Sequence, residues 1–196
     1  MHTLTIIQAR MSSTRLPGKA LLDLAGKPVL QHVVDRLADS WLKGHLLVAT
    51  SKNLSDDPIA DWCHSYKVDV YRGPLNDVLD RFHCCAKAYG ATTIVRVTAD
   101  CPLLDPHLLD RTIELLHSSG ADYAATQGFP PGVGQEAFTR DALFRAWRDA
   151  TSPHDREHVV PWMLNHPGLF RDVYVDNPSL TLDTPEDLER LRRMLA

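Results

Sequence analysis

The stretch Thr3-Leu-Thr-Ile-Ile-Gln8, followed directly by Ala9-Arg-Met-Ser-Ser-Thr-Arg-Leu-Pro-Gly-Lys19, decides how this chain of 196 residues is interpreted. Its first part is mostly β-branched and apolar, which predicts a buried strand. The loop that follows contains arginine, serine, threonine, glycine and lysine. Arginine pairs with phosphate oxygens bidentately, lysine adds a point charge, and small residues let backbone N–H groups approach an anion. The pattern predicts a triphosphate-binding loop at the end of a strand.

The loop matches neither of the common nucleotide motifs. In a Walker P-loop a glycine stands five residues before the glycine of Gly-Lys, whereas Ser13 stands there, and Lys19 is followed by Ala20. No G-x-G-x-x-G fingerprint of a dinucleotide site is present either.

Further along the chain, short β-rich runs alternate with helical patterns. Strands are predicted at residues 3–8, 45–50, 68–71, 93–98, 122–126 and 135–139. A helix is predicted over 28–41, with Pro28 in its first turn and Trp41 on its apolar face. Further helices run from an Asn76 cap to Gly90, and from Asp105 and Pro106 to Gly120.

This alternation predicts one α/β domain over residues 1–196, with a mixed, mostly parallel sheet flanked by helices. Ligands bind such sheets beyond the carboxyl ends of the strands. Residues 127–175 are expected to be an insertion that carries substrate and dimer contacts. At the end of the chain, Leu180-Thr-Leu182 predicts another strand, which leads through Thr184 into a helix.

Composition excludes several classes of protein. A net charge of −4 and a pI near 6.2 do not indicate binding to nucleic acid or to an anionic membrane. No apolar run approaches the roughly 18 residues of a membrane span, and the first residues are too polar for a secretory signal, so we expect a cytoplasmic protein. The four cysteines form no C-x-x-C pair and are expected to be free thiols in or near the core.

Several ordered motifs together resemble the CMP-sugar cytidylyltransferases, and among these the branch of spore-coat polysaccharide biosynthesis. They are the opening stretch through Lys19, Leu24-Ala-Gly-Lys-Pro-Val-Leu30, Asp77-Val-Leu-Asp-Arg-Phe82, Val95-Arg-Val-Thr-Ala-Asp-Cys-Pro-Leu103, Asp155-Arg-Glu-His-Val159 and Leu182-Asp-Thr-Pro-Glu-Asp-Leu188. The resemblance implies a glycosyltransferase-A-like nucleotidyltransferase fold, often homodimeric. It also implies transfer of CMP from CTP to an acidic sugar, with release of pyrophosphate. Ser12 stands where many members have glycine.

Two aspartates are candidates for binding Mg²⁺, which prefers carboxylate oxygens together with substrate phosphates and water. Asp100 follows the predicted strand 93–98, and Asp183 follows Leu180-Thr-Leu182. Both positions lie at the ligand edge of the predicted sheet, and the family motifs assign the same role to both residues. An aspartate after a strand is also a common helix cap or turn residue.

The resemblance distributes the remaining site residues between nucleotide and acceptor. Arg10, Ser12, Ser13, Arg15 and Lys19 would bind the triphosphate, with Arg10 and Lys19 also acting in catalysis. Arg72 and Arg81 would contact the base or the acceptor. The acceptor itself would meet Glu136, Arg156 and His158.

Three other interpretations stay open. His154-Asp-Arg-Glu-His158 matches the H-x-x-E-H signature of zinc hydrolases, in which Glu157 would be the base. That signature needs a sustained helix and a third ligand, and Pro153 and Pro161 bracket it closely. A glycosyltransferase that consumes a nucleotide sugar would use the same fold, and so would a non-enzymatic nucleotide-sugar-binding domain.

Overall fold

The structure is a computed structural model that describes residues 2–13 and 15–176. The strands of its main sheet are β1 (Thr3–Gln8), β4 (His45–Ser51), β5 (Asp69–Gly73), β6 (Thr93–Thr98), β7 (Tyr123–Gln127), β8 (Glu136–Thr139) and β9 (Asp172–Asp176). A small hairpin pairs β2 (Asp23–Leu24) with β3 (Lys27–Pro28). The helices are α1 (Val29–Ala38), α2 (Asp57–Tyr66), α3 (Val78–Ala88), α4 (Pro106–Ser119), α5 (Arg140–Asp149), α6 (Pro153–His158) and α7 (Pro161–Leu164), with short 3-10 turns η1 (Lys19–Leu21) and η2 (Leu54–Asp56).

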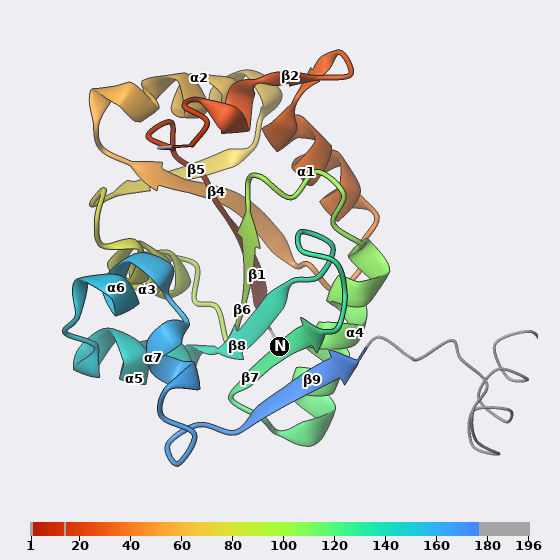
Figure 1. The fold of residues 1–196 in the computed structure, drawn as a ribbon, viewed down its shortest axis with the longest axis vertical. Coiled ribbons are helices and arrows are strands. Elements are labelled where there is room, and N and C mark those ends of the chain that lie inside the picture. Colours follow the sequence, from red (N-terminus) through yellow and green to blue (C-terminus); the bar gives the residue numbers. More distant parts are fainter. Residues whose placement is uncertain (1, 14, 177–196) are drawn as a thin grey trace, which may run out of the picture.

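The main sheet has the strand order β5-β4-β1-β6-β8-β7-β9 (Figure 1). Strands β5, β4, β1 and β6 are parallel, β8 is antiparallel to both of its neighbours, and β9 is parallel to β7. The predicted fold, a mixed and mostly parallel sheet flanked by helices, is therefore confirmed. The strands predicted within the described residues are all present, with no end shifted by more than two residues.

Helices cover both faces of the sheet, as expected when parallel strands are joined by helical crossovers. On one face, α1, α2 and α4 pack through residues such as Leu37, Ile59 and Ile113. On the other face, α3, α5 and α7 contribute Phe82, Leu143 and other buried side chains. Helices therefore cover much of both faces, and the carboxyl ends of β1 and β6 stay accessible at one edge of the sheet.

Two predictions about helix ends are wrong. The first helix ends at Ala38 rather than Trp41, and the Trp41 side chain is 68% exposed instead of facing the core. The buried carboxylate of Asp110 on α4 accepts hydrogen bonds from the Ser40 hydroxyl at 2.6 Å and from the Leu42 N–H at 3.0 Å. Because residues 40–42 bond to Asp110, they do not continue the helix. The cap of α3 is Asp77 rather than Asn76, since its carboxylate accepts from the Asp80 N–H at 2.9 Å.

The segment predicted as an insertion, residues 127–175, supplies β8, which lies inside the sheet between β6 and β7. The predicted strand 180–182 and the helix after it lie outside the described residues. No helix within the described residues is long and apolar enough to cross a membrane.

Candidate active site

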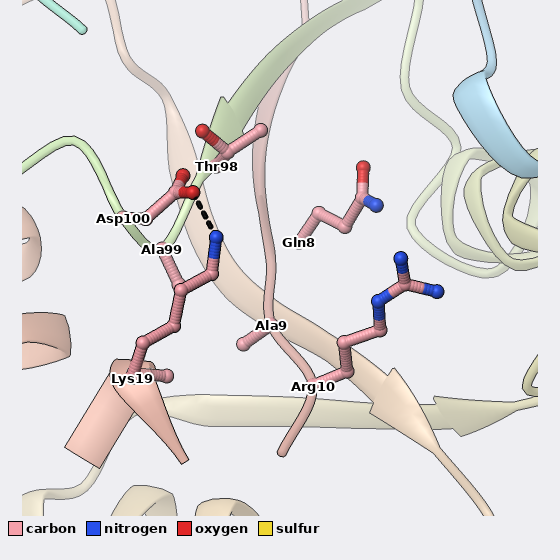
Figure 2. Close-up of a pocket in the computed structure, with 8 residues that line it drawn as sticks. Gln8, Ala9, Arg10, Lys19, Thr98, Ala99 and Asp100 are labelled. Atoms are coloured by element: carbon pink, nitrogen blue, oxygen red, sulfur yellow. Dashed lines mark hydrogen bonds and ion pairs between the residues drawn. The ribbon is translucent and has the colours of Figure 1, made fainter. Parts of the chain in front are cut away.

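The site forms where β1 and β6 end side by side in the middle of the sheet. These parallel neighbours pair Gln8 with Thr98, so the residues that follow, Arg10 and Asp100, leave the same edge. They line a pocket of about 110 Å³ together with Lys19 (Figure 2). Small-molecule pockets usually begin at about 300 Å³, so this space suits one charged part of a ligand rather than a whole nucleotide.

The loop after β1 is closed on itself by one carbonyl. The Met11 carbonyl accepts hydrogen bonds from the N–H groups of Ser13 and Gly18, both at 2.9 Å. Gly18 has φ 71°, a conformation that glycine adopts without a steric penalty, and it leads into η1 at Lys19. Ser12 does not have a positive φ angle, so its backbone conformation does not require the glycine that many family members have there.

A buried carboxylate, Asp56, anchors the start of this loop to β4. It accepts hydrogen bonds from the Met11 N–H at 2.7 Å, from the Ser51 N–H at 3.2 Å and from the Ser51 hydroxyl. The residue is fully buried at the end of η2. Sequence reasoning missed it, because the role depends on β1 and β4 being neighbours.

Lys19 and Asp100 form an ion pair across the pocket, drawn as the dashed line in Figure 2. Partial burial acts to raise the pKa of Asp100. Hydrogen bonds from Lys19 and Thr98, together with the lysine charge, outweigh it, so the pKa lies below its ordinary value. The carboxylate is therefore ionised at neutral pH and available to a cation.

Arg10 leaves the other side of the strand end, with its guanidinium directed away from the Lys19–Asp100 pair (Figure 2). Its Nη2 lies 2.9 Å from the Glu157 Oε1 on α6. This hydrogen bond lowers the pKa of Glu157 below its ordinary value. Helix α6 ends in a strained γ-turn, in which Val159 has φ 73° and the Val160 N–H bonds to the His158 carbonyl at 2.9 Å.

The other residues predicted for the nucleotide are spread out. Ser12 and Arg15 are exposed on the loop, and Ser13 is half-buried. Arg72 lies away from the pocket, where it pairs with Asp57 at 2.7 Å and donates to the carbonyls of Ser51 and Asn53 at 2.9 Å. Its predicted contact with nucleotide stays a prediction.

Arg81 is fully buried on α3, and none of its three guanidinium nitrogens has a hydrogen-bond partner among the described residues. Burial lowers the pKa of Arg81, and the negative charge of Asp56 opposes that shift. The Arg81 side chain therefore lies in the protein interior and not on the surface of the pocket. Its predicted contact with nucleotide is also untested.

The residues predicted for the acceptor occupy different places. Arg156 packs against α3, with its Nη2 2.7 Å from the Asp77 Oδ2 and its Nη1 2.7 Å from the Trp147 carbonyl. His158 is exposed on α6. Glu136 lines a second cavity, of about 340 Å³, that shares Thr98 with the first pocket. Only Glu136 therefore lies in a cavity next to Asp100, and the three acceptor roles stay predictions.

Comparison with known proteins agrees with this geometry. The family model described as cytidylyltransferase matches residues 4–191. This chain belongs to the cytidylyltransferase family. It is thus a nucleotidyltransferase, as its sequence motifs predict.

Individual relatives cover nearly all of the chain. The cytidylyltransferase is 35% identical to the spore coat polysaccharide biosynthesis protein SpsF of Bacillus subtilis, over 97% of this chain and 85% of that protein. It is 36% identical to the 3-deoxy-manno-octulosonate cytidylyltransferase of Brucella ovis, over 100% of this chain and 84% of that protein. A solved cytidylyltransferase structure from Leptospira borgpetersenii superposes with a TM-score of 0.86 at 33% identity, covering 98% of this chain and 85% of that one.

The second predicted metal ligand of this cytidylyltransferase, Asp183, lies outside the described residues. The zinc alternative gains no support from the geometry. Helix α6 is only 6 residues long, and Glu157 is held by Arg10. Within residues 2–13 and 15–176, no group of three or more His, Cys, Asp or Glu side chains is placed to hold a metal ion.

Sequence reasoning also missed Arg96, although the sequence carried a signal for it. Arg96 is the one charged residue in the apolar strand β6, and its Nη1 lies 2.7 Å from the Glu136 Oε2. A charge inside a central strand points to a polar cavity, because an unpaired charge would not be buried. The four cysteines are free, as expected, and burial raises the pKa of Cys63 and Cys85 to about 12.

Proposed function

We propose that this enzyme transfers CMP from CTP to an acidic sugar or a similar anionic acceptor and releases pyrophosphate. The observation that carries the proposal is the meeting of Arg10, Lys19 and Asp100 at the ends of β1 and β6, in a chain of the cytidylyltransferase family. Such a product would serve the synthesis of surface polysaccharides or other glycoconjugates. We further propose that the enzyme acts in the cytoplasm as a homodimer, and that it does not act on nucleic acid.

The triphosphate would lie on the loop from Arg10 to Lys19. Lys19 and Arg10 each hold a carboxylate partner on opposite sides of the pocket, Asp100 and Glu157 respectively. A phosphate that enters would take the place of these carboxylates and accept hydrogen bonds from Lys19 and, in a bidentate manner, from Arg10. The exposed side chains of Arg15 and Ser12, and the half-buried Ser13, would add donors from the loop. In this proposal Arg72 contacts the base only after it leaves its ion pair with Asp57, and Arg81 only after its buried side chain becomes accessible.

We also propose that a magnesium ion is held by Asp100 and Asp183. The ionised carboxylate of Asp100 is a hard oxygen donor at the pocket, and one or two carboxylates suffice when substrate phosphates and water complete the octahedron. When bound, the ion would neutralise charge on the phosphates and on departing pyrophosphate.

In the reaction, an acceptor hydroxyl oxygen forms a bond to the α-phosphorus of CTP. The bond from that phosphorus to the oxygen bridging the β-phosphate breaks, pyrophosphate leaves, and the hydroxyl proton passes to solvent. No covalent intermediate with the protein is required. Arg10 and Lys19 would hold the phosphates in line and stabilise the charge that develops during the transfer.

The test is pyrophosphate release with each of ATP, GTP, UTP and CTP, in the presence of Mg²⁺ and a panel of acidic sugars. We expect release with CTP and an acceptor, loss of release on chelation, and recovery when Mg²⁺ returns. A glycosyltransferase would release no pyrophosphate from free CTP, and a zinc hydrolase would not recover with Mg²⁺. The absence of release with every nucleotide and every acceptor would refute the proposed function.

Variants sharpen this test. Lys19→Met should lower kcat about 100- to 1,000-fold, the usual effect of losing one group that stabilises transition-state charge. Lys27→Met is the matched control, because Lys27 pairs with Asp35 on the surface, away from the pocket. Asp100→Asn and Asp183→Asn should each abolish turnover with little loss of fold, since the volume barely changes. Wild-type rates from both asparagine variants would exclude the two-aspartate site.

A further inference from the structure

We infer that the second cavity, beside the Asp100 pocket, binds an uncharged polar part of the acceptor, a hydroxyl or acylamido group, and that Gln135 determines this specificity. The inference rests on the proposed function, because it names what the same site accepts. The cavity is lined by residues of β6, β7 and β8 and by residues of the loop 129–134. At about 340 Å³ it falls within the range of small-molecule sites, which begin at about 300 Å³.

The cavity adjoins the proposed phosphate site. Thr98 lines both spaces, and Cys101 follows Asp100 directly into the second one. An acceptor seated there would present a hydroxyl toward the Asp100 pocket without having to bridge a gap in the surface. The second cavity is therefore placed for the molecule that receives the phosphate.

The fixed charges of the cavity neutralise each other. Among the described residues that line it, only Arg96 and Glu136 carry a charge, and their side chains lie 2.7 Å apart with 16% and 25% exposure. The Arg96 Nε also donates to the Gln8 Oε1 at 3.3 Å, and the Tyr123 hydroxyl donates to the Glu136 Oε1 at 3.1 Å. Burial and the nearby Glu136 raise the pKa of Tyr123, so the phenol stays neutral.

An anionic group would therefore gain little here. It would find Arg96 already paired and would be repelled by the partly buried carboxylate of Glu136. The carboxylate of an acidic acceptor would therefore lie outside the second cavity. What remains for the second cavity is the uncharged body of the sugar.

Gln135 supplies an unsatisfied donor for that body. Gln135 is one of the residues that line the cavity, the residue is only 5% exposed, and its buried Nε2 has no hydrogen-bond partner among the described residues. A buried donor left unpaired destabilises the folded state, so such groups are rare in folded proteins unless something binds them. A hydroxyl or amide oxygen of a ligand would satisfy it.

The remaining wall is apolar, which suits the C–H groups of a sugar chain or the methyl of an acyl group. It is formed by Phe129, Pro130, Pro131 and Leu164. Gly134 holds the loop against β7, because a Cβ at this position would lie 1.6 Å from the Thr126 Oγ1. A hydrogen-bond donor, an acceptor at Glu136 and an apolar wall together match a hydroxyl or acylamido group on a carbon chain.

The experiment measures KM for acceptor and for CTP in the wild type and in Gln135→Leu, which keeps the size of the side chain and removes its hydrogen bond. The probes are three 2-keto-3-deoxy sugar acids: Kdo, N-acetylneuraminic acid and its analogue with a hydroxyl in place of the acetamido group. For each probe that the wild type uses, we expect KM to rise about five- to tenfold, the worth of one neutral hydrogen bond. KM for CTP should stay within about twofold of the wild type.

Gln127→Leu is the matched control, because this glutamine at the end of β7 is exposed and outside the cavity lining. A rise in KM for CTP with unchanged KM for the acceptor would assign the cavity to the nucleotide and overturn the inference. Unchanged values for both substrates in Gln135→Leu would also overturn it. Circular dichroism and Tm of the two variants establish that each is folded.

Failure of the proposed function would be recognised separately, by a wild type that releases no pyrophosphate under any condition. In that case the same three sugar acids are titrated calorimetrically into the wild type and Gln135→Leu. Binding to the wild type that weakens about five- to tenfold in Gln135→Leu supports the cavity assignment. Equal binding to both proteins, or none to the wild type, refutes it.

Discussion

Replacing Asp56 by alanine should destabilise this protein more than any neighbouring carboxylate change, because Asp56 is the buried anchor of the proposed triphosphate loop. Its carboxylate accepts from the Met11 N–H, the Ser51 N–H and the Ser51 hydroxyl. The serine hydroxyl can rotate toward another partner, which leaves two backbone N–H groups unsatisfied. At about 1–3 kcal/mol for each buried orphan, we expect a loss of about 4 kcal/mol.

For a chain of this length each kcal/mol shifts Tm by about 2–4 °C, so Asp56→Ala should lower Tm by about 8–16 °C. The assay is calorimetric unfolding at neutral pH, together with chemical denaturation. Asp56→Asn should lose about half as much free energy, because the amide oxygen still accepts one bond while its NH₂ faces other donors. CTP binding should weaken in both variants, since the loop that begins at Met11 loses its attachment to β4.

Asp57→Ala is the control, as the adjacent carboxylate is 42% exposed and pairs with Arg72 at the surface. An exposed pair of this kind contributes less than about 1 kcal/mol. If Asp56→Ala and Asp57→Ala lower Tm equally, or if Asp56→Ala stays within about 1 kcal/mol of the wild type, the anchoring argument is wrong.

Three further predictions concern Gly134 in the wall of the second cavity, the ion pair of Arg156 with Asp77, and the carboxylate of Asp100. Gly134→Ala should lower Tm and weaken acceptor binding, because the added Cβ clashes with Thr126 on β7. Gly168→Ala is the control and should change neither quantity, because a Cβ there meets nothing within 4 Å. Equal Tm values for the two variants would contradict the close packing of Gly134 against β7. Arg156→Ala should cost about 2 kcal/mol in chemical denaturation, since it removes the charge-assisted hydrogen bonds to the partly exposed Asp77 carboxylate and the bond to the Trp147 carbonyl. A loss below about 1 kcal/mol would reduce the pair to a surface contact. The pKa of Asp100 in the folded protein lies below its ordinary value of 3.8, so the ionised carboxylate stabilises the fold fully above pH 3.8, and this stabilisation is lost as pH falls through the folded-state pKa. The Tm of Asp100→Asn should therefore decline less steeply in acid than the Tm of the wild type. Parallel declines of the two Tm values would argue against the pKa shift.

Local patterns were sufficient for much of the secondary structure. The β-branched and apolar run 3–8 forms β1, the carboxylate of Asp105 caps α4, and Gly120 ends that helix with φ 64°. These features depend on the backbone preferences of a few adjacent residues, and such preferences can be inferred from the sequence alone. Where a distant group intervened, local reasoning failed. The helix predicted through Trp41 stops at Ala38 because the carboxylate of Asp110 binds the residues that follow.

For the site, the sequence alone determined that a cationic loop follows the first strand and that an aspartate follows the strand 93–98. It also carried the ordered motifs of the cytidylyltransferases. Only the tertiary structure decided that β1 and β6 are neighbours, which brings Lys19 to Asp100 across 81 positions of the chain. Tertiary structure likewise enclosed Arg81 and paired Arg96 with Glu136. The physical reason is that charge pairing and burial depend on which strands are adjacent, and strand order is set by packing of the whole sheet rather than by any short stretch of residues.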